Sequence, residues 1–212
     1  MLTDDQKQQV RQRLEPVENP VTMHYVTQEF ECESCQTTHE LLRDLLETNE
    51  NLELVTYEFK DQPEDAERLG VDKIPALVLE GPEAGTRVRF FGVPAGYEFA
   101  ALLEDLIDVS RGATELSQQS RQQLETLIKP LHIQVFVTAT CPHCPGAVRT
   151  AHKLALASGK ISADMVSANE FPHLAQRYGV MSVPQTVVND GEASFVGALP
   201  EDQFVAQVMQ AA

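Results

Sequence analysis

Two Cys-x-x-Cys motifs separated by one fixed distance constrain the fold of this chain more than any other feature. Cys32-Glu33-Ser34-Cys35 precedes Cys141-Pro142-His143-Cys144 by 109 residues. Pro75 and Pro184 follow their respective motifs at one common spacing, so these prolines are also 109 residues apart. Because self-similarity at a fixed period is typical of duplicated structural units, the sequence predicts two copies of one unit.

Weaker matches extend the repeat on both sides of the cysteines. Between the first motif and Pro75, three further residues recur at the same offset of 109. They are Arg68, Gly70 and Val71, which recur as Arg177, Gly179 and Val180. Upstream, Arg11-Gln12 recurs as Arg121-Gln122 at an offset of 110, and downstream Gly92 recurs as Gly197 at an offset of 105. We therefore predict one domain over residues 1–112 and a second over residues 113–212.

Each copy is expected to contain the same order of elements. A polar helix (4–14 and 116–128) leads to a strand (21–26 and 132–137), and the cysteine motif then opens an amphipathic helix. A second strand, a short helix, the equally spaced proline, a β-hairpin and a final helix follow. The predicted fold class is α/β, and a unit of ~100 residues in this order can bury its own core.

The net charge of the chain limits the kinds of molecule that it can bind. The chain carries a formal charge of −16, and most of it lies before residue 113. This charge argues against binding of nucleic acid or of an anionic membrane. The acidic first half is either a solvated face that aids solubility or a docking face for a basic partner.

The cysteines and the N-terminus bear on location. All four cysteines fall in the two motifs, which favours redox or metal chemistry over a scattered disulfide framework. No apolar run approaches the ~18 residues that span a bilayer, and the polar start of the chain is not a secretory signal. We expect a cytoplasmic protein.

The motif order carries a family resemblance. A strand, a Cys-x-x-Cys pair at a helix start and a loop proline before a hairpin look like the thioredoxin fold. Two such units in tandem, with Cys-Pro-His-Cys-Pro in the second, resemble the glutaredoxin-like protein disulfide oxidoreductases of archaea and thermophilic bacteria. The resemblance implies two thioredoxin-like domains, each a mixed central sheet flanked by helices. The N-terminal domain of the alkyl hydroperoxide reductase flavoprotein is a rival relative, but its first unit lacks the cysteine pair.

The second motif suits thiol–disulfide exchange. A thiolate attacks, and a helix N-terminus favours that anion. Pro142 suits the first helical position, where a missing N–H is no loss, and His143 can add positive charge or a donor. We predict Cys141 as the nucleophile and Cys144 as the resolving cysteine. The alternative is a structural zinc half-site, although zinc usually needs four ligands.

The first motif leaves more alternatives open. Glu29, Glu31 and Glu33 crowd Cys32, and like charge opposes a thiolate. Cys32 and Cys35 are a redox site, a relay to the second pair or a structural disulfide. Their spacing to His39 also offers three ligands to a metal, although we expect His39 to be a helix-face residue.

The loop prolines belong to the same resemblance. Ile74-Pro75 and Val183-Pro184 resemble the cis-proline loop of the thioredoxin fold, in which the residue before proline pairs with substrate backbone. One feature departs from the family. Thioredoxins and eukaryotic disulfide isomerases carry a buried acid six residues before the first cysteine, whereas this chain has Val26 and Val135 there.

These observations lead to three hypotheses. The first is an enzyme that makes, breaks or reshuffles disulfides in protein substrates, without a bound cofactor or metal and with the second pair as its main site. A flavoprotein resembling thioredoxin reductase is a further candidate partner. The second is an electron carrier between a flavoprotein reductase and a peroxidase. The third is a metal-binding or scaffold protein without enzymatic activity.

Overall fold

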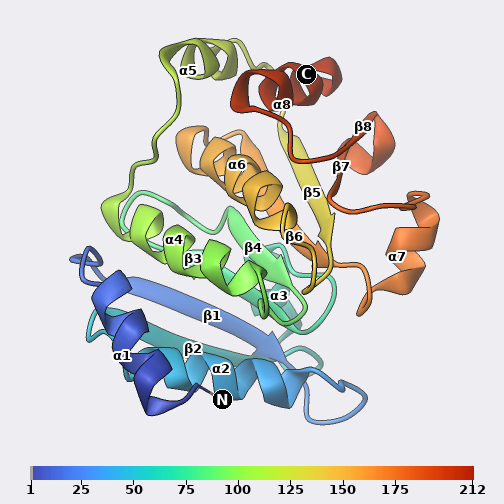
Figure 1. Cartoon of the computed structure of the whole chain (residues 1–212). Helices are drawn as coiled ribbons and strands as arrows, with labels where there is room; N and C mark the ends of the chain where they lie inside the picture. The colour runs from blue at the N-terminus through green and yellow to red at the C-terminus, as the bar shows by residue number, and fades with distance from the viewer. Residues whose placement is uncertain (1) are drawn as a thin grey trace. The chain divides into compact units, whose positions relative to one another are not determined.

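The chain forms two compact units. The computed structural model describes residues 2–212 (Figure 1). The first unit contains the chain up to Pro94 together with Leu102–Gly112, and the second contains Ala95–Ala101 together with Ala113–Ala212. Apart from the segment 95–101, the chain passes from one unit to the other between Gly112 and Ala113.

The first unit is built on a four-stranded mixed sheet in the order β2-β1-β3-β4. Strand β1 is parallel to β2 and antiparallel to β3, and β3 forms a hairpin with β4. In chain order its elements are α1 (Asp4–Arg13), β1 (Val21–Thr27), α2 (Cys35–Leu46), β2 (Leu52–Glu58), α3 (Pro63–Leu69), β3 (Ala76–Glu80), β4 (Val88–Phe91) and α4 (Glu98–Arg111), of which residues 98–101 belong to the second unit.

The second unit repeats this topology, with the strand order β6-β5-β7-β8. Strand β5 is parallel to β6 and antiparallel to β7, which forms a hairpin with β8. Its elements are α5 (Gln118–Glu125), β5 (Leu131–Val137), α6 (Cys144–Ala157), β6 (Ile161–Ser167), α7 (Pro172–Arg177), β7 (Gln185–Val188), β8 (Ala193–Val196) and α8 (Glu201–Val208), with 3-10 turns at Asn189–Gly191 and Met209–Ala211. The predicted fold class, two tandem thioredoxin-like domains, is confirmed.

The helix after each cysteine pair is held by its apolar face. The apolar residues that recur at helical spacing in α6 are all fully buried, namely Ala147, Val148, Ala151, Leu154 and Ala155. In α2, Leu42 and Leu45 are fully buried and Leu41 is nearly so. Leu46, which was predicted on the same face, is only half-buried, and Arg43 faces solvent. Helix α6 packs on β5 and β6, and α2 packs on β2. Burial of these side chains therefore fixes where each helix begins relative to its sheet.

Local signals explain most of the element ends. The Thr3 side chain and Gln6 form a reciprocal capping box at the start of α1. Helix α3 ends at Gly70, whose φ of 68° is a left-handed conformation that glycine adopts without strain. Helix α5 is shorter than the predicted 116–128. It begins only after Ser117, which accepts the Ser120 backbone N–H, and it ends before the exposed Ile128.

The described part of the chain contains no helix that is long and apolar enough to cross a membrane.

Shortening a buried side chain of α2 should test how much the sheet contact stabilises the first unit. Leu42→Ala is expected to lower the free energy of unfolding by about 2–5 kcal/mol, because it removes buried methyl groups and leaves a cavity. The matched control is the neighbouring exposed Arg43→Ala, which should change it by about 0.5 kcal/mol or less. Chemical denaturation measures both, and equal effects would contradict the assigned helix face.

Candidate active sites at the two cysteine pairs

The second cysteine pair forms a disulfide at the start of α6. Cys141 and Cys144 are bonded, with their Cα atoms 5.5 Å apart. Cys144 is fully buried, whereas Cys141 is 8% exposed and is the more accessible sulfur of the pair. The backbone N–H of Cys144, the first residue of α6, donates to Cys141 Sγ at 3.1 Å. One of the unpaired N–H groups of the helix terminus is thus directed at the predicted nucleophile.

One detail of the predicted helix start is wrong. Pro142 does not occupy the first helical position, because α6 begins at Cys144 with His143 as its N-cap residue and Pro145 in its first turn. Pro142 lies in the turn before the helix, and Cys141 precedes the helix by three residues. This placement leaves the Cys144 N–H free of the helix ladder, so that it can reach the sulfur.

Both loop prolines follow cis peptide bonds, as the resemblance implied, at Ile74-Pro75 and Val183-Pro184. The backbone oxygen of Val183 lies 3.8 Å from Cys141 Sγ. Each proline ends its loop at a hairpin, because β3 begins at Ala76 and β7 at Gln185. The Val183-Pro184 loop is therefore positioned directly beside the sulfur of the second pair.

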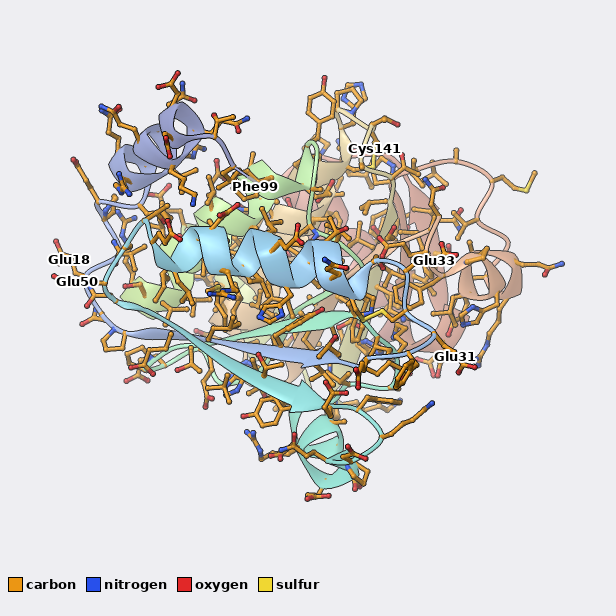
Figure 2. All side chains as sticks on the ribbon, turned by 90° about the horizontal axis from the view of Figure 1, so that it is seen from below. Glu18, Glu31, Glu33, Glu50, Phe99 and Cys141 are labelled. Carbon is orange, nitrogen blue, oxygen red and sulfur yellow. A yellow bond between two sulfur atoms is a disulfide. The ribbon has the colours of Figure 1, made fainter. Side chains whose placement is uncertain are left out.

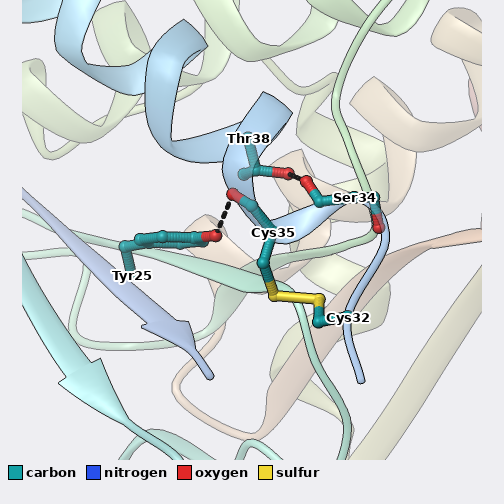
Figure 3. Close-up of a disulfide and its surroundings, with 5 residues drawn as sticks. All are labelled: Tyr25, Cys32, Ser34, Cys35 and Thr38. Carbon is teal, nitrogen blue, oxygen red and sulfur yellow. Dashed lines mark hydrogen bonds between the residues drawn. A yellow bond between two sulfur atoms is a disulfide. The ribbon is translucent and has the colours of Figure 1, made fainter. Parts of the chain in front are cut away.

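The first cysteine pair also forms a disulfide, with its Cα atoms 5.4 Å apart (Figure 3). Cys35 is the first residue of α2 and is buried, while Cys32 is half-buried in the preceding loop. Tyr25 Oη on β1 donates to the Cys35 carbonyl oxygen at 2.6 Å. Thr38 donates to the Ser34 carbonyl oxygen through both its backbone N–H and its hydroxyl, which ties down the first turn of α2.

The phenol of Tyr25 stays protonated at neutral pH. Tyr25 is fully buried, and burial raises the pKa of its phenol to about 12. The negative charge of Glu58 adds to this rise, whereas a hydrogen bond with Thr27 opposes it. Tyr25 is therefore a permanent hydrogen-bond donor to the start of α2, and sequence reasoning missed it.

Carboxylates surround the first pair. Glu29 and Glu33 line a hollow of about 380 Å³ together with both cysteines, His39 and Glu58. Glu31 and Glu33 lie on the loop that leads into α2 (Figure 2). Glu31 is exposed and lies 3.8 Å from the exposed Lys60, a distance at which a solvated ion pair contributes little. Of the three glutamates predicted to crowd Cys32, Glu29 and Glu33 thus share a hollow with it, whereas Glu31 does not line that hollow.

The two sites differ in the length of one loop. Four residues separate β1 from Cys32, whereas three separate β5 from Cys141. The extra length explains why the repeat offset changes from 110 to 109 between the strand and the cysteines. Strand register then makes Val135 the counterpart of Tyr25, since Thr27 pairs with Glu58 as Val137 pairs with Ser167. A valine therefore occupies the position in the second unit that Tyr25 occupies in the first.

Neither His143 nor His39 forms a hydrogen bond with a cysteine sulfur in the part of the chain that the structure describes. His143 is exposed, and no hydrogen bond joins its ring to a sulfur within residues 2–212. Its role as a charge or donor beside Cys141 stays a prediction. The ring of His39 contacts Tyr25, with 5.8 Å between the ring centroids, in agreement with a helix-face position. No group of three or more metal-binding side chains is found in the part of the chain that the structure describes.

The two units share the thioredoxin-like fold, and each holds a disulfide at a helix start. The family model for a thioredoxin domain matches residues 131–210. The crystal structure of a protein disulfide oxidoreductase from Aeropyrum pernix is 30% identical, covers 98% of this chain and 92% of that chain, and superposes with a TM-score of 0.90. The chain belongs to the family of protein disulfide oxidoreductases.

A second group of relatives is the alkyl hydroperoxide reductases. The F component of this enzyme from Staphylococcus aureus is 27% identical over 91% of this chain, but the chain spans only 35% of that relative's length. The NTD_N/C domain of the Enterococcus faecalis enzyme has the same fold, with a TM-score of 0.89 at 23% identity, and the match covers 98% of this chain and 100% of that chain. This chain thus corresponds to one part of the longer relatives.

Removing the Tyr25 hydroxyl should weaken the start of α2. Tyr25→Phe is expected to lower the free energy of unfolding by about 1 kcal/mol, because the Cys35 carbonyl oxygen loses a buried donor while the ring still fills its site. The control Tyr97→Phe removes a hydroxyl from a residue that is 53% exposed and should have no measurable effect. Denaturant unfolding of the oxidised protein distinguishes the two, and an unchanged Tyr25→Phe midpoint would show that the bond contributes nothing.

Proposed function

We propose that the Cys141–Cys144 pair is the main active site and exchanges disulfides with protein substrates. The observation that carries this proposal is the hydrogen bond from the Cys144 N–H to Cys141 Sγ. After reduction, the same N–H stabilises a thiolate at Cys141, because a charged acceptor strengthens a hydrogen bond. No corresponding bond to Cys32 Sγ is found among the described residues.

Accessibility supports the division of roles within each pair. A substrate sulfur must approach the attacking cysteine in line, whereas the resolving cysteine needs to reach only its partner. Cys141 is more exposed than Cys144, and Cys32 is more exposed than Cys35. Cys141 and Cys32 are therefore assigned as nucleophiles, and Cys144 and Cys35 as resolving cysteines.

The surroundings of Cys141 favour an extended polypeptide as substrate. The Val183 carbonyl oxygen, close to the sulfur, is available to accept a backbone N–H from a strand laid beside the Val183-Pro184 loop. Met181, two residues earlier in this loop, is 92% exposed and offers a flexible apolar contact. Ile74 and Pro75 are assigned the same binding role in the first unit.

Single cysteine substitutions should separate attack from resolution at the main site. Cys141→Ser is expected to abolish most reduction of insulin disulfides, because the nucleophile is lost. Cys144→Ser should instead accumulate mixed disulfides with substrate, because attack proceeds and resolution fails. Gel electrophoresis without reductant detects these adducts. Cys35→Ser is the matched control at the first pair, and full insulin reduction by Cys141→Ser would overturn the assignment.

The first pair is proposed to be redox-active but slower at neutral pH. The carboxylates of Glu29 and Glu33 line the same hollow as Cys32, so their charge opposes a thiolate there. The same charge attracts a substrate or partner with basic side chains around its disulfide. In this arrangement the first pair accepts basic partners or relays electrons to the second pair.

Alkylation of the reduced protein should reveal this asymmetry. Iodoacetamide at pH 6 is expected to label Cys141 well before Cys32, because the Cys32 thiolate is disfavoured by nearby carboxylates. The gap should narrow in 1 M salt, where the screening length falls to about 3 Å. Peptide mapping by mass spectrometry gives both rates in one sample. Glu33→Gln should bring the rates closer at low salt, and equal labelling of the unsubstituted protein would remove the electrostatic argument.

A second candidate function is electron transfer between a flavoprotein reductase and a peroxidase. It is favoured by similarity to the F component of alkyl hydroperoxide reductase over 91% of this chain. An electron carrier of this kind would reduce a peroxidase rapidly and insulin slowly, with reducing equivalents from a flavoprotein resembling thioredoxin reductase. Comparing turnover with these two acceptors, in variants that keep only one cysteine pair, decides between the two functions.

A further inference from the structure

The resolving cysteine of each pair needs a group that takes its proton. A thiol attacks the mixed disulfide only after it loses that proton, since the thiolate is the nucleophile. The positions six residues before each nucleophile hold Val26 and Val135, which are both fully buried. Neither valine can accept a proton, so the acceptor must lie elsewhere.

Glu58 is the last residue of β2 and lines the same hollow as Cys32 and Cys35. It pairs in register with Thr27, the last residue of β1, and therefore approaches the cysteines from the sheet. The carboxylate is on a half-buried residue, and the hollow of about 380 Å³ has room for several water molecules. Glu58 thus combines access to water with a position at the disulfide.

Tyr25 lies close to both the Glu58 carboxylate and Cys35. Tyr25 Oη lies 2.6 Å from the Cys35 carbonyl oxygen, and the same phenol is close enough to Glu58 to have its pKa raised by that charge. The three residues therefore form one cluster, and Figure 3 shows the phenol beneath the helix start. Tyr25 cannot accept the proton itself, because it is already protonated.

We propose that Glu58 is the proton acceptor for Cys35 during resolution at the first pair. This role rests on the proposed redox activity of the Cys32–Cys35 pair. The Cys35 thiol transfers its proton to the Glu58 carboxylate, directly or through one water in the hollow. The Cys35 thiolate then attacks Cys32 Sγ, and the bond between Cys32 and the substrate sulfur breaks. The bonding electron pair leaves on the substrate sulfur, which takes up a proton.

The redox change balances over the full cycle. Attack by Cys32 has already released the first substrate thiol, and resolution releases the second. The substrate disulfide is therefore reduced to two thiols, while the Cys32–Cys35 dithiol is oxidised to the disulfide seen in the structure. The reverse sequence oxidises a substrate dithiol, with Glu58 returning the proton to Cys35.

The other charged groups around the hollow are placed less well for this task. Glu29 and Glu33 are exposed loop residues that flank the nucleophile, where their charge affects attack by Cys32. His39 lies one helical turn after Cys35, and its ring is held against Tyr25. Lys60, two residues beyond Glu58, is exposed and lies near Glu31.

The second pair lacks this carboxylate. Val137 pairs with Ser167 as Thr27 pairs with Glu58, so Ser167 occupies the matching strand end. A serine hydroxyl is no base at neutral pH. An effect of Glu58 on resolution should therefore be confined to the first pair, which gives the experiment an internal comparison.

The test separates attack from resolution in one measurement. The full-length protein with Cys141→Ser and Cys144→Ser is reduced, freed of reductant and mixed rapidly with 2,2′-dithiodipyridine. Attack by Cys32 releases one equivalent of thiopyridone, and resolution by Cys35 releases a second. This reagent is neutral at the working pH, so the loss of a carboxylate does not alter its attraction to the site.

Glu58→Gln is expected to slow the second release about tenfold or more near neutral pH, while the first release changes little. The rate of the second release should also become steeply pH-dependent. It should increase as the pH approaches the ordinary thiol pKa of ~8.5, because the variant relies on spontaneous ionisation of Cys35. Glu58→Asp should recover part of the rate. A normal first release in Glu58→Gln shows that the site remains folded.

Matched controls assign the effect to one carboxylate. Glu33→Gln removes the same charge from the same hollow and should alter the first release only. His39→Gln should leave the second release within about twofold, because His39 takes no part in the proposed proton transfer, whereas loss of a general base slows a step by far more than this. Slowing of the second release by His39→Gln alone would assign the proton to His39 and overturn the proposal.

The outcomes distinguish a failure of the redox activity of the first pair from a failure of the role of Glu58. Absence of the first release in the parent protein would overturn the redox activity of the first pair, and the role of Glu58 with it. A normal first release followed by an unchanged second release in Glu58→Gln would overturn the role of Glu58 alone. In the complementary variant that keeps only Cys141 and Cys144, Glu58→Gln should change neither release.

Discussion

Both sites depend on packing between the helix that follows the cysteine pair and strands of the sheet, α6 on β5 and β6 and α2 on β2. Burial of the apolar face of α6 against β5 and β6 fixes the first backbone N–H of that helix opposite a sulfur. The hydrogen bond itself contributes about 1 kcal/mol net, and more to a charged acceptor. The larger energy lies in the buried leucine, valine and alanine side chains that prevent the helix from sliding. A rigid apolar contact thus holds a weak polar interaction in the position where it affects reactivity.

The features predicted well from the sequence are those that repeat or that have a fixed period. Spacing alone identified the two units, the cysteine pairs and the loop prolines, because each recurs at nearly the same offset. The buried face of α6 followed from its 3.6-residue period, since these side chains have one apolar layer to enter. The family resemblance supplied the cis geometry before Pro75 and Pro184, which no local pattern specifies.

The features that the sequence did not reveal depend on contacts between distant segments. Tyr25 resembles any aromatic residue in a buried strand until its hydroxyl is seen at the Cys35 carbonyl oxygen. Glu58 resembles a polar strand end until register places it beside Thr27 and the cysteines. The start of α6 was misplaced because proline is compatible with both a first helical turn and the loop before it, and only tertiary packing decides between them.

Glu31 has a consequence for anyone who exchanges active-site sequences between the two units. It lies in the longer of the two connections between strand and cysteine, and its φ of 59° is a left-handed conformation that is uncommon for a residue with a side chain. Grafting Pro-His between Cys32 and Cys35 would copy the dipeptide and leave this backbone path unchanged. The length and path of this loop thus distinguish the two sites independently of the two residues between the cysteines.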